Sequence, residues 1–122
     1  MKIWFDTEFI DDGKTVELIS IGMVREDGET YYAESSECDV SRACAWVQKN
    51  VVPHLCGPQK TRQEIKWDII KFSGIQPQFW GYFADYDWVV LAQLFGTMMD
   101  LPQHWPMFCM DVQQVRIERG IG

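Results

Sequence analysis

This sequence has few of the features that mark secreted, membrane-spanning or zinc-binding proteins. Its four cysteines form no C-x-x-C pair, and its longest uninterrupted apolar run, Trp88 to Ala92, is too short to span a membrane. The opening MKIWFDTE has no apolar signal core before a small-residue cleavage site. We therefore predict a cytoplasmic protein with reduced cysteines.

Positive charge is scarce as well. Lysine and arginine number 11 against 18 aspartates and glutamates, which gives a net charge of −7. This balance argues against a protein that holds nucleic acid on a broad basic face. It leaves open an enzyme that contacts phosphates through divalent ions, because such ions are held by carboxylates and reverse the local sign of charge.

Strand patterns fill the first third of the chain. The 122 residues suffice for a single domain, 1–122, and the 47% hydrophobic content is enough for it to fold. Strands are expected at Lys2–Phe9, Val16–Val24 and 30–34, separated by turns at Gly13 and Asp27-Gly28. Three strands joined by such short turns predict an antiparallel meander.

Helices and strands then alternate. Helix starts are expected after four cap residues, which are Asp39, Thr61 (in the TRQE capping box), Asp85 and Asp111. Further strands are expected at 79–84 and 107–110, and CGPQK at 56–60 is expected to be a loop. The order predicts an α/β fold with a mixed five-stranded sheet, antiparallel in its first three strands and then parallel, flanked by helices.

Most tryptophans are expected in the core. Trp46 and Trp67 lie on amphipathic helical patterns, and Trp4 and Trp80 lie on strand patterns. Trp105 lies in a loop, where exposure is expected.

The stretch FDTEF places two carboxylates inside an aromatic strand. Asp6 and Glu8 are two residues apart, so their side chains share a face about 7 Å apart along the backbone. Carboxylates at this spacing can converge on one metal ion or on two neighbouring ions. A solvated strand end is the alternative for any single D-x-E.

A third carboxylate follows at the start of the helix after residues 79–84. The positive helix N-terminus accommodates acidic residues, so Asp87 can be purely structural. However, one cap suffices, and Asp85 is the better placed of the two. Because Asp87 is not needed as a cap, we favour the interpretation that it is a ligand of a cation.

Taken in order, FDTEF, ELISIG and YFADYDWVVLAQLFG resemble the DEDD superfamily of 3′-to-5′ exonucleases. Within it, the sequence is most similar to the mycobacterial polyadenylate-specific exoribonuclease family with its bacterial and phage relatives. The resemblance covers nearly the whole chain. It implies a ribonuclease H-like fold, in agreement with the predicted order of elements.

The resemblance also implies roles for individual residues. Asp6 and Glu8 match the first exonuclease motif and Asp87 the second, so these three would be catalytic and would hold two Mg²⁺ or Mn²⁺ ions. Thr7 and Phe9 would contact the terminal nucleoside. The implied partner is the single-stranded 3′ end of RNA, with DNA possible, and the implied assembly is a homodimer.

The third motif of that superfamily, a histidine followed five residues later by an aspartate, is absent from these 122 residues. After Asp87 the only histidine is His104, and Asp111 follows it seven residues later. We expect His104 to be a loop residue and Asp111 a helix cap. The expectation is therefore a C-terminally incomplete domain that lacks its last helix and is weak or inactive as it stands.

Other functions remain open at this point. A ribonuclease H-like endonuclease also uses carboxylates and two metal ions. A catalytically incomplete nucleic-acid-binding module and a metal-free α/β domain with solubilising acids also fit the composition. The sequence offers no motif for a 2′-hydroxyl contact, so it does not distinguish RNA from DNA.

Overall fold

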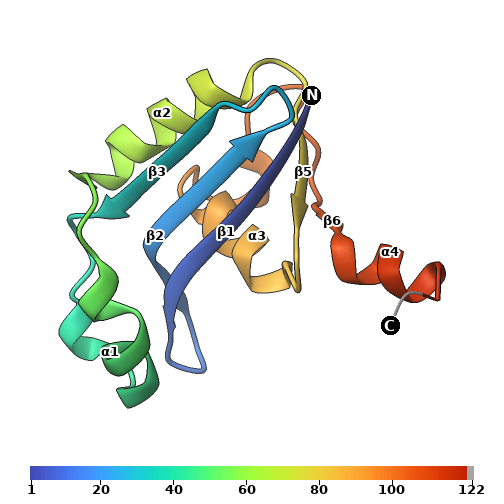
Figure 1. Cartoon of the computed structure of the whole chain (residues 1–122). Helices are drawn as coiled ribbons and strands as arrows, with labels where there is room; N and C mark the ends of the chain where they lie inside the picture. Colours follow the sequence, from blue (N-terminus) through green and yellow to red (C-terminus); the bar gives the residue numbers. More distant parts are fainter. Residues whose placement is uncertain (121–122) are drawn as a thin grey trace.

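The computed structural model describes residues 1–120 and has one mixed sheet with helices packed against it (Figure 1). The sheet has six strands in the order β4-β3-β2-β1-β5-β6. This α/β architecture is consistent with the ribonuclease H-like class. No helix in the described part of the chain is long and apolar enough to cross a membrane.

The meander forms as predicted. Strands β1 (Lys2–Asp11), β2 (Val16–Arg25) and β3 (Thr30–Ser35) pair antiparallel in sequence order. Gly13 and Gly28, at the two turns, have φ angles of +84° and +93°, which residues with a Cβ rarely adopt. The register of β1 against β2 shifts between Glu8 and Phe9.

The predicted count of five strands is wrong, because the expected loop at 56–60 contains a sixth. Strand β4 (Gln59–Lys60) pairs parallel with β3. It has only two residues and no apolar alternation, so it carries no strand pattern in the sequence. The other parallel strands are β5 (Gln78–Gly81), beside β1, and β6 (Met110–Asp111), beside β5.

The helices are α1 (Ala45–Asn50), α2 (Arg62–Ser73), α3 (Asp85–Gln93) and α4 (Val112–Glu118). The Thr61–Glu64 capping box and the Asp111 cap are confirmed. The Asp85 cap is wrong, because Ala84 is the N-cap of α3 and Asp85 lies inside the first turn. The Asp39 side chain caps a short 3-10 helix, Val40–Arg42, rather than α1.

The main core lies between the sheet and the two helices behind it in Figure 1, α2 and α3. The opposite face of β1 to β3 is largely open, with α1 covering only its lower end (Figure 1). This asymmetry explains the wrong prediction for Trp4, whereas the other errors have different causes. Trp4 projects from the open face and is 39% exposed, and Trp46 and Trp67 lie on the outer sides of their helices at 65% and 50%. Trp105, expected in solvent, is 8% exposed and packs against Phe79 and Phe95.

Strands β1 and β5 separate partway along the sheet. Their parallel pairing runs only from Lys2–Gln78 to Trp4–Trp80, and beyond it β1 pairs with β2 alone. The chain leaves β5 at Gly81 and enters α3 at Asp85. The carboxyl ends of parallel strands are where α/β proteins commonly bind ligands.

Candidate active site

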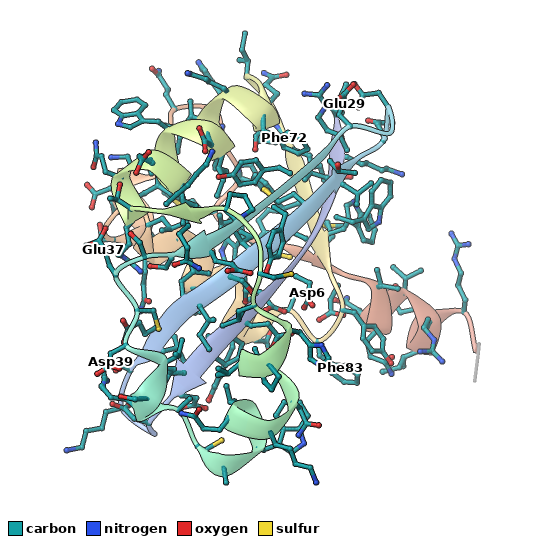
Figure 2. All side chains as sticks on the ribbon, turned by 60° about the vertical axis from the view of Figure 1, so that its left-hand side comes forward. Asp6, Glu29, Glu37, Asp39, Phe72 and Phe83 are labelled. Carbon is teal, nitrogen blue, oxygen red and sulfur yellow. The ribbon has the colours of Figure 1, made fainter. Side chains whose placement is uncertain are left out.

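Three predicted acids lie near one another where the pairing of β1 with β5 ends. Asp6 and Glu8 project from β1, and Asp87 lies in the first turn of α3. Figure 2 shows Asp6 projecting from the middle of the sheet. The charge of Asp87 acts on both β1 acids, since it contributes to raising the pKa of Asp6 and of Glu8. The structure therefore brings together residues that lie some 80 positions apart in the chain.

The buried Asp87 carboxylate has hydrogen-bond partners on β1. It is 5% exposed, and its Oδ1 accepts hydrogen bonds from the Thr7 backbone N–H at 3.1 Å and from the Thr7 hydroxyl. Thr7 is itself buried on the α3 side of β1. Its hydroxyl therefore orients Asp87, and Thr7 also lines a cavity beside Asp6 and Glu8, so its predicted contact with the substrate stays a prediction.

Negative charge is crowded at this site. Burial is the main reason why the pKa values of Asp6, Glu8 and Asp87 are raised above their usual range. Repulsion adds to the effect, from Asp87 on Asp6, from Asp6 on Glu8 and from Asp111 on Asp87. The hydrogen bonds from Thr7 act in the opposite direction on the pKa of Asp87. A cation would relieve this repulsion.

The donor atoms suit a hard divalent cation, because Mg²⁺ and Mn²⁺ prefer carboxylate oxygens. In the described residues, however, no group of three or more His, Cys, Asp or Glu side chains is already gathered closely enough to hold a metal ion. Asp6, Glu8 and Asp87 thus carry oxygen atoms of the kind that bind Mg²⁺ or Mn²⁺ and lie near one another. Their side chains are not arranged as a complete metal-binding site.

A cavity of about 270 Å³ opens beside the two β1 acids, on the face of the sheet near α1. Besides Asp6 and Glu8, its polar lining comes from Thr7, Ser20, Tyr32, Asn50 and His54. Tyr32 could have been found from the sequence. In the meander Asp6 pairs with Gly22 and Gly22 with Tyr32, so the register places Asp6 and Tyr32 on one face. Asn50 and His54, around the end of α1, carry no such signal.

Tyr32 is held in place by a buried carboxylate. Its hydroxyl donates to Glu34 at 2.7 Å, and Glu34 is 1% exposed. Glu34 also accepts from the Gly57 N–H at 3.0 Å and from the Gln59 side-chain amide at 2.6 Å. One carboxylate thus fixes both a wall of the cavity and the segment that forms β4.

Phe9, the other predicted substrate residue, lies partly buried against Tyr86 of α3. Their ring centroids are 5.9 Å apart and the rings are tilted by 51°. Phe9 directly follows Glu8, and Tyr86 directly precedes Asp87. The aromatic pair therefore borders the acids on the α3 side of the sheet.

His104 and Asp111 do not supply a third motif. His104 is an exposed loop residue with φ of +74°, as expected for a loop. Asp111 accepts hydrogen bonds from the backbone N–H groups of Phe83, Ala84 and Gln113, at 3.3, 3.0 and 2.8 Å. Its carboxylate fixes the approach to α3 and the start of α4.

Comparisons with known proteins show which family this chain resembles. The sequence model of the 3′-5′ exoribonuclease Rv2179c-like domain matches residues 1–116. Two relatives from Mycobacterium tuberculosis, strains H37Rv and CDC 1551 / Oshkosh, are each named a 3′-5′ exoribonuclease. Each is 43% identical over 128 aligned positions, which cover 98% of this chain and 76% of the relative. The matched region includes all three candidate acids.

Proposed function

Because this chain belongs to the 3′-5′ exoribonuclease Rv2179c-like domain family, we propose that it removes nucleoside monophosphates from the 3′ end of RNA by metal-dependent hydrolysis. The observation that carries the proposal is the proximity of Asp6, Glu8 and Asp87 where the pairing of β1 with β5 ends, beside a cavity that Asp6 and Glu8 line. The chain's negative charge accords with it, because a polyanion can approach such a site only through bound cations.

The metal ligands in this proposal are Asp6, Glu8 and Asp87, with Mg²⁺ or Mn²⁺ as the ions, the arrangement expected of the DEDD exonucleases. A bound ion supplies an activated water and stabilises the charge on the leaving 3′ oxygen. The chain's own part is to position the acids. Thr7 orients Asp87 through its hydroxyl and N–H, and the rigid pairing of β1 with β2 fixes Asp6 and Glu8.

The 3′-terminal nucleoside would occupy the 270 Å³ cavity beside the acids. Tyr32 offers an aromatic surface there, and Asn50 and His54 offer hydrogen-bonding groups. Phe9, on the α3 side, would contact the strand as it leaves the cavity.

Digestion of labelled RNA tests the proposal. Single-stranded RNA is incubated with the chain and Mn²⁺ or Mg²⁺, and the products are resolved by size. Mononucleotides should accumulate from the first time point, and a chelator or a blocked 3′ end should stop their release. Asp6→Asn, Glu8→Gln and Asp87→Asn should each lower the rate by about 100-fold or more. Asp85→Asn is the matched control, because Asp85 is exposed in the same turn of α3 and should leave the rate unchanged.

The alternatives give different products. A ribonuclease H-like endonuclease would release oligonucleotides and would cut RNA with a blocked 3′ end. A binding module would retain RNA without shortening it. For a metal-free domain, Mn²⁺ would shift the melting temperature of the parent chain and of Asp6→Asn equally. A parallel digestion of DNA with the same sequence measures the preference for RNA, which would require a contact to the 2′-hydroxyl.

The homodimer that the resemblance implies stays a prediction. Sedimentation velocity across a concentration series tests it, since a dimer would sediment as a single species of about twice the 14.3 kDa chain mass. A species of 14.3 kDa at every concentration would remove the prediction.

A further inference from the structure

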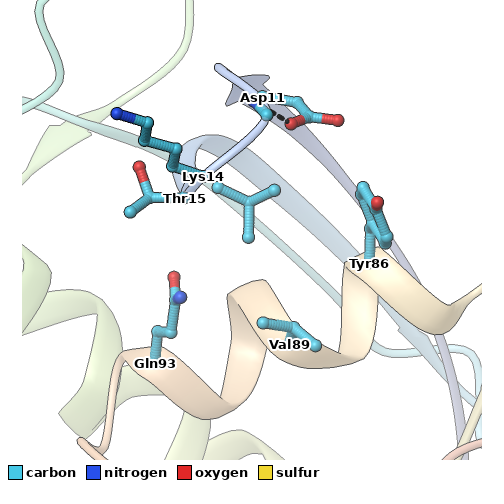
Figure 3. A pocket seen from close by; sticks show the side chains of 8 residues that line it. Asp11, Lys14, Thr15, Tyr86, Val89 and Gln93 are labelled. Atoms are coloured by element: carbon cyan, nitrogen blue, oxygen red, sulfur yellow. Dashed lines mark hydrogen bonds between the residues drawn. The ribbon is translucent and has the colours of Figure 1, made fainter.

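A second cavity lies between the β1–β2 turn and the outer side of α3 (Figure 3). Its volume is about 320 Å³, within the range of small-ligand pockets. Asp11, Lys14 and Thr15 line it from the turn, and Tyr86, Val89 and Gln93 line it from α3 (Figure 3). None of these residues has a role in the catalytic site proposed above.

This cavity adjoins the acids through shared elements. Asp11 lies three residues beyond Glu8 on β1, and Gln93 lies six residues beyond Asp87 on α3. At the rise of a strand and of a helix, both separations are about 10 Å. The Phe9–Tyr86 ring pair stands between the acids and the cavity. Neighbouring nucleotides of one extended strand can span such a distance.

The lining suits a nucleotide. Tyr86 is 52% exposed and Val89 is 44% exposed, so together they offer an uncovered apolar surface for a base. The ammonium of Lys14 forms no ion pair or hydrogen bond within residues 1–120, and neither does the side-chain amide of Gln93. In a chain with a net charge of −7, a cation without a protein partner beside an apolar wall is well suited to bind a phosphate.

We propose that this cavity is a second nucleotide subsite, which holds the RNA strand upstream of the terminal nucleotide. The inference rests on the proposed function. At a 3′ end the terminal nucleoside fills the cavity beside Asp6 and Glu8, so any further nucleotide that the protein contacts lies upstream. The strand passes over the unpaired edge of β1, past Phe9, and places a base against Tyr86 and a phosphate beside Lys14. Gln93 donates a hydrogen bond to the base or the sugar.

Binding of RNA to single variants tests the subsite without depending on catalysis. The probe is a fluorescein-labelled 12-nucleotide oligoadenylate with phosphorothioate linkages at its 3′ end, measured by anisotropy in Mn²⁺. Gln93→Ala should raise Kd by about 2- to 12-fold, the cost of one hydrogen bond. Lys14→Ala should weaken binding and reduce the slope of log K against log salt by about 0.7, the value for one lost single-strand phosphate contact. AMP, which lacks an upstream nucleotide, should bind all variants alike.

The controls are Lys71→Ala and Gln63→Ala, which make the same chemical changes at exposed positions of α2. Their Kd values should remain within twofold of the parent chain. A Kd for Lys14→Ala and Gln93→Ala within twofold of the parent, or an equal loss in the controls, would overturn the subsite. An equal loss of AMP affinity would also overturn it, because the cavity would then bind the terminal nucleotide.

Photocrosslinking gives the direction of the strand. Oligonucleotides carry 4-thiouridine at the last, second-last or third-last position, and crosslinked peptides are mapped. An upstream label should crosslink to Lys14 or to residues 89–93, which lie away from the acids, whereas the terminal label should not. Absence of upstream crosslinks there would contradict the assignment.

If RNA binds this way but is not shortened, the proposed function fails and the subsite stands. If RNA is shortened with the variants unchanged, the subsite alone fails.

Discussion

Thr7 and Asp87 form a buried polar pair that joins β1 to α3 across 80 positions of the chain. The pair shows how one residue serves fold and site together. The Thr7 N–H and hydroxyl both donate to one carboxylate oxygen of Asp87. Without them, a charged group that is 5% exposed would lack compensation for its lost hydration.

Replacing Thr7 with valine isolates the hydroxyl, because the two side chains have nearly the same shape. Thr7→Val should lower the free energy of unfolding by about 1–3 kcal/mol, since Asp87 loses one of its two donors. Urea unfolding measures the change. Thr7→Ser keeps the hydroxyl and should retain more stability than Thr7→Val. Equal stability of Thr7→Val and the parent chain would show that the hydroxyl contributes nothing.

Asp68 on α2 gives a prediction of pH dependence. It accepts hydrogen bonds from Tyr31 at 2.8 Å and from Lys60 at 2.6 Å, and so links β3, β4 and α2. Burial raises its pKa, but the bonds from Lys60 and Tyr31 outweigh burial, so the pKa is lowered overall. A lowered folded-state pKa stabilises the fold above the unfolded value of about 3.9, and this stability is lost as pH falls through the folded-state pKa.

Asp68→Asn should therefore lower the free energy of unfolding by about 1 kcal/mol at pH 7, a modest value because both partners are partly exposed. The difference from the parent chain should shrink as pH falls below about 4. Denaturant unfolding at pH 7, 4 and 2.5 measures it. A difference that stays constant over this range would assign the effect to packing rather than to charge.

At the scale of elements, the sequence was informative where local patterns decide the structure. The meander, the Thr61 capping box and the Asp111 cap follow from alternation, turn glycines and short-range hydrogen bonds, and all three were predicted correctly. Strand β4 was missed because its pairing depends on Glu34, 25 residues earlier than Gln59. The cap of α3 was wrong because the Asp111 carboxylate, from a distant strand, takes the N–H groups of Phe83 and Ala84.

The role of Glu34 in holding β4 can be measured directly. The Glu34 carboxylate accepts hydrogen bonds from three donors. In Glu34→Gln the side-chain NH₂ group, itself a donor, would face one of them, so the free energy of unfolding should fall by about 2–3 kcal/mol. The Glu34 and Ser36 amides, which donate to Pro58 and Lys60, should exchange hydrogen faster while the β1–β2 amides stay protected. Glu29→Gln, at the exposed β2–β3 turn, is the matched control. Unchanged protection of Ser36 in Glu34→Gln would contradict this role.

At the scale of the whole molecule, the sequence predicts candidate acids but not the residues that surround them. Asp6 and Glu8 share a face by strand geometry alone, and the proximity of Asp87 came from family resemblance. The hydrogen bonds between Thr7 and Asp87 could not be predicted, because they depend on how close α3 lies to β1, and no local sequence pattern gives that distance. The prediction for Trp4 failed because hydrophobic character does not reveal which face of a sheet is left open, and those for Trp46 and Trp67 failed because it does not reveal which side of a helix faces the core.

The net charge of −7 gives a prediction that concerns the chain as a whole. With a chelator present, RNA should bind very weakly, and added salt should not weaken binding further, because salt screens a repulsion. With Mg²⁺ or Mn²⁺, binding should be at least about tenfold tighter and should fall with salt. Anisotropy at 50 and 200 mM KCl measures both cases. Strong, salt-sensitive binding in the chelator would point to a basic surface instead.

The separation of β1 from β5 has a consequence for how the chain avoids self-association. Beyond Trp4, β1 pairs on one side only, and an open strand edge is a template on which another chain can add. Asp87 already occupies the Thr7 N–H on that edge, and Asp6 and Glu8 place like charges beside it. The acids that we propose for catalysis should thus also disfavour intermolecular sheet growth. A variant that neutralises all of them would lose this protection, and aggregates should appear as activity disappears.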